Sequence, residues 1–378
     1  AAYRAAKALW AEQPDDVSVE WADGASLRVT RTLRRSSLKL RIVRRRDWFG
    51  VAGGADVDGR PIALQALLEA ARAGRRYVRL GSGDLVAIDR DLRAHLARAG
   101  DVLHETKDGI AAHPPALDAL TALVEDEGSQ IVAAKEWLEL RARIRAAQSS
   151  EPELPRDLRA ELRPYQVEGY RWLMRLAACG AGGCLADDMG LGKTLQSLAV
   201  LAARAALGPA LVVAPTSVCS NWPSEAARFA PSLTLVSYRG PRRRELIERI
   251  GPGSVLVVSY DVLLRDIDAL APIAFATAFF DEAHALKNAH AKRVAAVRRI
   301  QADVRFALTG TPIENHTGEL WSLFRIVVPG LFGSWDRFRE RFAAPIERDR
   351  DPARRDALAA VVRPYLLRRT KAEVAPEL

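Results

Sequence analysis

Apolar runs in the second half of the chain stop at glycine-rich or polar segments, in the order expected of an α/β fold. Residues 182–186 and 273–280 are almost wholly apolar, which predicts strands that are covered on both faces of a parallel sheet. Residues 195–201 open a helix, because Leu195, Leu198 and Ala199 recur at the spacing of one helical face. The first strand therefore leads through a glycine turn directly into a helix.

The first 150 residues follow another pattern, which predicts a smaller α+β accessory domain. Residues 38–42 alternate apolar and basic side chains, as a half-buried strand does, and Gly53 and Gly54 are candidates for a turn. An amphipathic helix over residues 64–73 ends at Gly74. Further patterns predict a hairpin at 77–80 and 85–88, helices at 91–99, 116–126 and 131–147, and a proline-containing linker at 149–155.

The glycine turn before residue 195 has the composition of a phosphate-binding loop. Backbone N–H groups and the dipole at a helix N-terminus both attract anions. Lys193 can reach the β- and γ-phosphates, and Thr194 offers a hydroxyl to Mg²⁺. The usual motif has glycine where this chain has Asp187, so the match fails at one position. We expect a nucleoside triphosphate at the loop residues Asp188, Met189, Gly190, Leu191, Gly192, Lys193, Thr194 and Leu195.

An acidic pair follows the apolar run at 273–280. At the carboxyl end of a parallel strand, Asp281 can hold Mg²⁺ while Glu282 orients and activates the attacking water. Phosphoryl transfer depends on positioning and charge neutralisation, so the candidate catalytic residues are Lys193, Asp281 and Glu282, and the candidate metal ligands are Thr194 and Asp281. No Cys or His lies at ligand spacing from His284, which is expected to contact another domain or the loop at 309–311 rather than a metal.

Six stretches together resemble one family: LRPYQVEGYRWL (162–173), DDMGLGKTLQSLA (187–199), LVVAPTSVCSNWPSE (211–225), VLVVSYDVL (255–263), FFDEAHALKN (279–288) and LTGTPIENHTGELWSLFRIVVPGLFGSWDRFRERFAAPIE (308–347). From about Leu158 onward the chain is similar to the first ATPase lobe of the Swi/Snf-type, chromatin-remodeller-like DNA translocases of helicase superfamily two, in the bacterial type. The resemblance implies a RecA-like parallel sheet with helices on both faces, ATP and Mg²⁺ as ligands, and duplex DNA, in some cases carrying a bound protein complex, as partner.

The resemblance also implies roles for single residues. Gln166 matches the glutamine that reads adenine, and its amide can both donate and accept a hydrogen bond. Thr309, Gly310 and Thr311 match the loop that couples the γ-phosphate to nucleic acid, and His284 is placed with them. Contacts to the DNA backbone are implied for Ser217, Ser220, Asn221, Ser259 and Tyr260, although such residues are also common turn formers. Trp222 and Trp321 are interpreted as packing residues.

The same resemblance divides the chain into three parts. These are the accessory domain (1–150), the first RecA-like lobe (151–345) and a segment leading towards a second lobe (346–378). In these enzymes ATP lies between two lobes, and the second supplies an arginine finger, which contributes about 10³–10⁵ in rate. Nothing after Thr370 resembles a second lobe, so we expect these 378 residues alone to hydrolyse little ATP and the full-length protein to be the ATPase.

Composition agrees with this interpretation. A hydrophobic content of 49% is sufficient for real cores, and a formal net charge of +9 favours a polyanionic partner. Three cysteines, Cys179, Cys184 and Cys219, lack CxxC spacing, which argues for a reducing compartment and against a zinc site. Arg204 interrupts the longest apolar stretch, so no membrane span is expected. Arginine outnumbers lysine 48 to 8, which is typical of a GC-rich bacterial genome and places the protein in a bacterial cytosol or nucleoid.

Two questions stay open at this level. Nine Lys or Arg and no acid lie between residues 28 and 46, which is consistent either with the solvated face of a sheet or with a face that binds DNA or a partner. The function itself has two alternatives, an RNA or restriction-type DNA helicase and a nucleotide-switched interaction module. An intact Lys193, Asp281 and Glu282 argue against a degenerate lobe.

Overall fold

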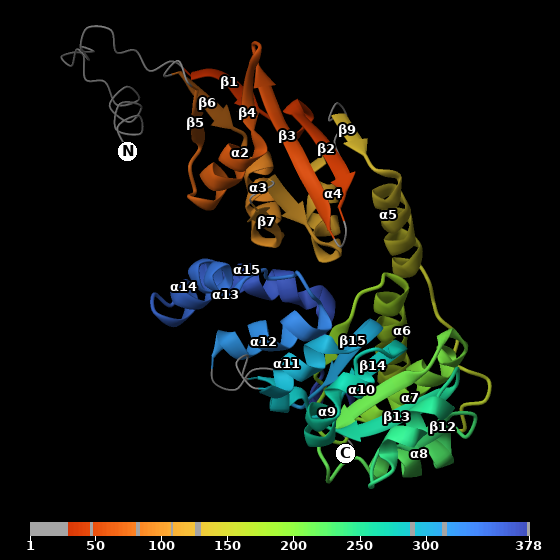
Figure 1. The fold of residues 1–378 in the computed structure, drawn as a ribbon. Helices are drawn as coiled ribbons and strands as arrows, with labels where there is room; N and C mark the ends of the chain where they lie inside the picture. The colour runs from red at the N-terminus through yellow and green to blue at the C-terminus, as the bar shows by residue number, and fades with distance from the viewer. Residues whose placement is uncertain are drawn as a thin grey trace, which may run out of the picture. The chain divides into compact units, whose positions relative to one another are not determined.

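The structure is a computed structural model that describes residues 29–45, 48–80, 84–106, 109–124, 130–287, 292–311 and 316–375. The chain divides into two compact units, and Figure 1 shows their elements in chain order. The first unit comprises the chain up to Ala112 together with Ala116–Ala134. The second comprises His113–Pro115 together with the chain from Lys135 onward. The linker expected at 149–155 thus lies inside the second unit, whose helix α5 (Lys135–Gln148) packs against α6 (Pro164–Ala178).

The first unit contains two sheets and three α-helices in its described part. A three-stranded sheet has the order β1-β6-β5, and a second sheet has the order β7-β8-β3-β2-β9 with β4 paired to β3. Its elements are β1 (Val29–Leu33), β2 (Leu38–Arg44), β3 (Phe49–Val57), β4 (Arg60–Ala63), α2 (Leu64–Arg72), β5 (Tyr77–Arg79), β6 (Leu85–Ile88), α3 (Arg90–Val102), β7 (Leu103–Thr106), β8 (Gly109–Ala112), α4 (Leu117–Val124) and β9 (Gln130–Ala133). The predicted α+β character, the hairpin β5–β6 and the helix α2 are confirmed.

Two local predictions are wrong, one inside this unit and one where the chain leaves it. Gly53 and Gly54 form no turn but lie inside β3. A Cβ atom on Gly53 would come within 2.1 Å of the Lys39 carbonyl oxygen, and one on Gly54 within 1.9 Å of the Ile62 carbonyl oxygen. Glycine is therefore required by close approach of neighbouring strands. The helix predicted from residue 131 begins only at Lys135, because Gln130–Ala133 pair in parallel with β2 as strand β9.

The second unit is built on a seven-stranded sheet with the order β12-β13-β11-β14-β15-β10-β16, in which every pairing is parallel. The strands are β10 (Gly183–Leu185), β11 (Ala210–Ala214), β12 (Thr234–Ser237), β13 (Ser254–Ser259), β14 (Ala274–Phe280), β15 (Gln301–Leu308) and β16 (Leu366–Leu367). Continuous burial along β11 and β13 confirms that apolar runs in this chain mark strands covered on both faces.

Helices cover the sheet in two groups. The first group comprises α6, α7 (Lys193–Ala203) and α8 (Asn221–Phe229), and the second comprises α9 (Tyr260–Arg265), α11 (Lys292–Arg299) and α12 (Thr317–Val327). The remaining short helices are α10 (Ile267–Leu270), α13 (Trp335–Phe338), α14 (Ala344–Glu347), α15 (Pro352–Val362) and α16 (Lys371–Val374). The predicted α/β class with a parallel sheet is confirmed. In the described part of the chain, no helix has the length and apolar character needed to cross a membrane.

The last strand comes from a part of the chain that the sequence placed outside the lobe. Leu366 and Leu367 pair in parallel with Cys184 and Leu185, so β16 lies directly beside the strand that leads into the glycine loop. The segment after residue 363 therefore completes the sheet at one edge. This arrangement brings residues 369–371 next to a loop about 180 positions earlier in the sequence.

Candidate nucleotide-binding site

The glycine loop joins β10 to α7 and has the backbone conformation that its glycines predict. Gly190 has φ 87° and Gly192 has φ 77°, both in the left-handed region that disfavours other residues. A Cβ atom on Gly192 would also come within 2.4 Å of the Gln166 amide nitrogen. Gly192 is the N-cap of α7 and leaves the first turn without a side-chain cap. The helix N-terminus can therefore offer its N–H groups to a phosphate.

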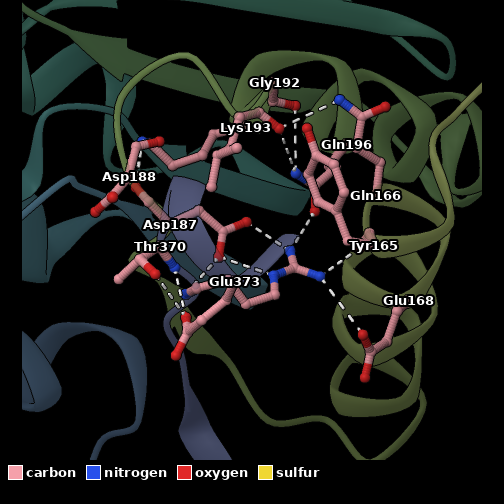
Figure 2. A network of polar contacts seen from close by, with 12 residues as sticks. Tyr165, Gln166, Glu168, Asp187, Asp188, Gly192, Lys193, Gln196, Thr370 and Glu373 are labelled. Atoms are coloured by element: carbon pink, nitrogen blue, oxygen red, sulfur yellow. Dashed lines mark hydrogen bonds and ion pairs between the residues drawn. The ribbon is translucent and has the colours of Figure 1, made fainter. Parts of the chain in front are cut away.

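Lys193 lies in this loop with its ammonium turned onto the backbone. Its Nζ donates to the carbonyl oxygens of Asp187 at 2.7 Å and Asp188 at 3.2 Å (Figure 2). Burial lowers the pKa of Lys193, while the charges of Asp187, Glu282 and Asp281 act in the opposite direction. The glycine loop follows β10 and the acidic pair follows β14, and both strands pair in parallel with β15, so the three residues predicted to be catalytic lie at the same edge of the sheet.

Gln166 is buried against the glycine loop. Its Oε1 accepts a hydrogen bond from the backbone N–H of Arg163 at 3.0 Å, and its Nε2 donates to the Leu191 carbonyl oxygen at 3.2 Å. Gln196 of α7 donates to the same carbonyl at 3.4 Å. The residue expected to read adenine therefore lies beside the phosphate loop, and its role with the base stays a prediction.

Asp281 ends β14 with both carboxylate oxygens already hydrogen-bonded. Trp222 Nε1 donates to Oδ2 at 3.0 Å, and the backbone N–H of Glu282 donates to Oδ1 at 2.9 Å. Burial raises the pKa of Asp281, and these two donors oppose that rise. A carboxylate oxygen has a second lone pair, so each can still bind a cation.

Glu282 has φ 47°, in the left-handed region where residues other than glycine are uncommon. Its Oε2 lies 3.3 Å from His284 Nδ1. Strained backbone of this kind is concentrated at functional sites, where the surrounding structure maintains it. His284 thus contacts the acidic pair itself; a contact with another domain or with the loop after β15 stays a prediction.

The loop after β15 lies against the glycine loop. Thr309 is buried, its backbone N–H donates to the Leu185 carbonyl oxygen at 3.2 Å, and its hydroxyl accepts from the Thr311 N–H at 3.2 Å. A Cβ atom on Gly310 would lie 3.5 Å from Cγ of Met189. The predicted coupling loop therefore lies beside the glycine loop, and its coupling role stays a prediction. Pro312 to Asn315, which continue the motif, lie outside the described residues.

The five residues proposed to contact DNA fall into two groups. Ser217, Ser220 and Asn221 are exposed at the start of α8. Ser259 and Tyr260 are buried: the Ser259 hydroxyl caps α9 at the Val262 N–H, and the Tyr260 hydroxyl donates to the Asp281 carbonyl oxygen at 2.9 Å. The internal partners of Ser259 and Tyr260 explain these residues without DNA, so their contact with a DNA backbone stays a prediction.

Sequence reasoning missed two members of the site. The packing interpretation of Trp222 is confirmed, since its side chain is fully buried in the core, but its indole N–H also donates to Asp281, a contact that nothing local in the sequence signals. Trp321, by comparison, packs edge-on to Trp335 and donates to the Gly333 carbonyl, as a core residue would. The second omission is Arg369, which pairs with the fully buried Asp187, the residue that departs from the usual loop motif. Cys179, Cys184 and Cys219, all in the described part of the chain, form no disulfide with one another.

Comparison with known proteins places this site in a family. Residues 165–378 match the SNF2-related domain. The chain is 39% identical over 252 residues to the putative ATP-dependent helicase/translocase YwqA of Bacillus subtilis, covering 65% of this chain and 27% of YwqA. It is 36% identical over 253 residues to the TATA-binding protein-associated factor MOT1 of Saccharomyces cerevisiae, covering 60% of this chain and 14% of that protein. The chain thus spans about a quarter or less of these relatives.

Solved structures give the same result. The SWI2/SNF2 ATPase core of Sulfolobus solfataricus in complex with double-stranded DNA matches with a TM-score of 0.54 and 39% identity, over 59% of this chain and 47% of that one. The Sulfolobus solfataricus SWI2/SNF2 ATPase core domain matches with a TM-score of 0.55 and 39% identity, over 60% of this chain and 47% of that one. The glycine loop, the acidic pair and the coupling loop thus lie in a shared fold, and the chain belongs to the SNF2-related family of helicase-like ATPases.

Proposed function

We propose that the second unit is the ATP-binding lobe of a DNA-dependent ATPase that moves along duplex DNA and remodels protein–DNA complexes. The observation that carries the proposal is the placement of the glycine loop and of the pair Asp281 and Glu282 at the carboxyl edge of one parallel sheet, after β10 and β14, which both pair with β15. A positive charge, a metal-binding carboxylate and a carboxylate base at one edge of a sheet are the requirements of phosphoryl transfer. The family of the chain and the DNA-bound neighbour support the polyanionic partner.

Each residue of the site would have a distinct role, set by its position. Lys193, released from the carbonyls that it now contacts, would bind the β- and γ-phosphates. Glu282 would accept a proton from the attacking water, with His284 beside its carboxylate. Gln166 would bond the adenine edge, since its amide is already fixed at the loop. None of these groups needs to form a covalent intermediate.

The site also fits a Mg²⁺ ion. Thr194 is the half-buried second residue of α7, in the first turn after the loop, and Asp281 retains acceptor capacity after its two hydrogen bonds. Oxygen ligands of this kind, completed by phosphate and water, are what Mg²⁺ prefers. Bound there, the ion would neutralise charge on the phosphates. In the described part of the chain, this site included, no three or more His, Cys, Asp or Glu residues gather into a cluster that could hold a metal ion, so phosphate and water would have to complete the coordination.

We propose that residues 1–378 alone turn over little ATP. A single RecA-like sheet is present among the described residues, and an arginine finger from a second lobe contributes about 10³–10⁵ in rate in related phosphoryl transfer. We expect turnover by this polypeptide to stay below the order of 1 s⁻¹, the low end of ordinary enzymes. A DNA-stimulated rate at or above that value would show that the site is completed in another way, such as by a second copy.

The experiment that tests the proposed function measures ATP hydrolysis by the full-length protein with duplex DNA, with RNA and with no nucleic acid. We expect duplex DNA to stimulate hydrolysis and RNA to have little effect. Triplex displacement and strand separation on the same duplex then distinguish a translocase from a helicase. Stimulation by RNA alone, or efficient unwinding, would favour the helicase alternative, and nucleotide binding without any hydrolysis would favour the interaction module.

A further inference from the structure

Residues 366–374, which we call the docked segment, are hydrogen-bonded along the beginning of the phosphate loop. The backbone N–H of Ala186 donates to the Leu367 carbonyl oxygen at 2.7 Å, and that of Asp188 donates to the Arg369 carbonyl oxygen at 3.0 Å. In return, the N–H of Lys371 donates to Asp188 Oδ2 at 3.1 Å. The strand pairing of β16 with β10 therefore continues past the strand and into the loop that would hold phosphate.

Arg369 anchors this segment through a buried ion pair. Its Nε donates to Asp187 Oδ1 at 3.0 Å and its Nη2 to Oδ2 at 2.5 Å, so the guanidinium and the carboxylate meet at two points. Arg369 is 7% exposed and Asp187 is fully buried. A buried carboxylate without a partner is strongly unfavourable, and a bidentate arginine is the pairing that satisfies both of its oxygens.

The remaining donors of Arg369 reach the other end of the loop. Nη1 donates to the Tyr165 carbonyl oxygen, and Nη2 also donates to Gln196 Oε1 at 3.1 Å. Gln196 in turn donates to the carbonyl oxygens of Leu191 and Gly192, both at 3.4 Å. One guanidinium thus connects Asp187, before the loop, with the two residues that precede Lys193.

Close packing around the guanidinium shows that its position is built into the fold. A Cβ atom on Gly169 would come within 2.8 Å of Arg369 Nη2 and 1.9 Å of Gln196 Oε1, so any larger residue there on α6 would displace both groups from these positions. The carbonyl and the carboxylate of Asp187 bind different cations: the carbonyl accepts from Lys193 and the carboxylate from Arg369. The Lys371 ammonium lies beside Gly190: a Cβ atom added to Gly190 would be 3.6 Å from the Lys371 nitrogen.

We propose that Arg369 is a positioning residue for the nucleotide, and that ATP binding and attachment of the docked segment are coupled through the Asp187–Arg369 pair. The inference rests on the proposed function, since it requires ATP at the phosphate loop. Arg369 does not touch the phosphates; it fixes the ends of the loop that do. By reciprocity, the factor by which docking raises affinity for ATP equals the factor by which ATP stabilises docking. Residues in one polar network couple by about 2- to 150-fold.

Nucleotide binding by three variants tests the first half of the proposal. The polypeptide of residues 1–378 is titrated with a fluorescent ATP analogue and Mg²⁺, and both the dissociation constant and the number of sites are measured. Arg369→Ala should weaken binding about tenfold or more, within the coupling range above. Arg369→Lys, which keeps the charge but cannot bond at two points, should give an intermediate value. Arg368→Ala, the exposed neighbour, should bind as the wild type does.

Hydrogen exchange on the wild type tests the second half and needs no substitution. Mg²⁺ and the analogue should slow exchange at Ala186, Asp188 and Lys371, whose N–H groups hold the docked segment to the loop. A merely structural role for Arg369 predicts a different result. In Arg369→Ala, fewer molecules would be folded and able to bind, but those that bind would have the dissociation constant of the wild type. Nucleotide would not change hydrogen exchange in the docked segment.

The outcomes separate the two proposals. Suppose that the wild type binds nucleotide. An Arg369→Ala variant with the same dissociation constant, or hydrogen exchange at Lys371 that nucleotide does not change, would then overturn the coupling and leave ATP binding intact. If Arg369→Ala fails to fold, the Arg369→Lys titration and the wild-type exchange decide alone. No binding by the wild type would refute ATP binding and the coupling together.

Discussion

Charged side chains occupy two regions of this molecule in opposite ways. At the phosphate loop, Asp187, Arg369 and Asp281 are buried and each is bonded to named donors or acceptors. On β2, by contrast, Lys39 and Arg41 alternate with the buried Leu38, Leu40 and Ile42 and project to solvent. A buried charge is fixed in one geometry by its partner, whereas an exposed one retains its freedom and its hydration.

The difference has consequences for function. Substitution in the first region should change a specific step, because each group has one position and one set of contacts. Substitution on β2 should act through charge alone, in a manner that depends on salt and not on DNA sequence. The alternation of β2 settles that its charges are exposed, as the sequence predicted, and leaves open whether DNA, a protein or solvent faces them.

The largest effect is expected at Glu282. Glu282→Gln removes the proposed proton acceptor while it preserves the shape and hydrogen-bonding capacity of the side chain. Turnover of the full-length protein should fall by about 10²–10⁴, the usual contribution of a general base, with ATP still bound. Steady-state hydrolysis and nucleotide retention measure the two quantities. Equal DNA-stimulated rates in the variant and the wild type would remove Glu282 from the mechanism.

A smaller effect, with a pH signature, is expected at Trp222. Burial raises the pKa of Asp281, and the bond from Trp222 Nε1 lowers it. Trp222→Phe removes that bond, so the pKa should rise further and a larger fraction of Asp281 should be protonated at a given pH. Since Mg²⁺ binds the carboxylate, the acidic limb of the ATPase pH profile should move to higher pH. Trp321→Phe, which loses an indole bond to Gly333 instead, is the control.

An unchanged acidic limb in Trp222→Phe would show that Asp281 does not limit activity at low pH. Activity at the optimum pH should decrease less than in Glu282→Gln, because Asp281 is retained and keeps its hydrogen bond from the Glu282 N–H.

Charge reversal on β2 should have a moderate and uniform effect. Lys39, Arg41 and Arg45 are exposed, whereas Arg44 stacks over Phe49 and is left unchanged. Changing the three to Glu should weaken binding to all DNA sequences alike, with the fold retained, since exposed substitutions usually alter stability by less than about 0.5 kcal/mol each. Arg75, Arg76 and Arg79, exposed on the same unit, serve as the matched control. Equal losses in both triple variants would indicate a general charge effect and no β2 face.

The smallest effect is expected in the salt dependence. Neutralising Lys39, Arg41 and Arg45 to Gln should flatten the slope of log affinity against log salt by up to about 0.9 per lost phosphate contact. The measurement is DNA affinity over a series of salt concentrations. A slope identical to that of the wild type would mean that this face contacts no phosphate.

The sequence predicted those parts of the molecule where short-range pattern and local chemistry agree. The glycines, Lys193 and Thr194 lie within one strand–turn–helix, so their proximity follows from the chain itself. The strand before Asp281 was also predicted from local pattern, because a continuous apolar run has few alternatives to a buried strand. Since the sheet is parallel, the glycine loop and Asp281 then lie at the same edge of it.

What the sequence could not predict depends on contacts between distant positions. Nothing local distinguishes Arg369 from the exposed Arg368 beside it; only the pairing of β16 with β10 turns one of them onto Asp187. Trp222 reaches Asp281 across 59 positions for a similar reason. Gly53 and Gly54 were misinterpreted as a turn because a close approach of strands and a turn both select glycine.

The central claim is that the loop around Lys193 holds Mg²⁺–ATP, and equilibrium titration of the protein with a fluorescent ATP analogue tests it most directly. Wild type should bind with an affinity that requires Mg²⁺. Lys193→Ala should bind at least about tenfold more weakly, because the charge that meets the β- and γ-phosphates is lost. Lys135→Ala, an exposed lysine on α5, should match the wild type. Equal affinities for wild type and Lys193→Ala, or binding indifferent to Mg²⁺, would contradict the account.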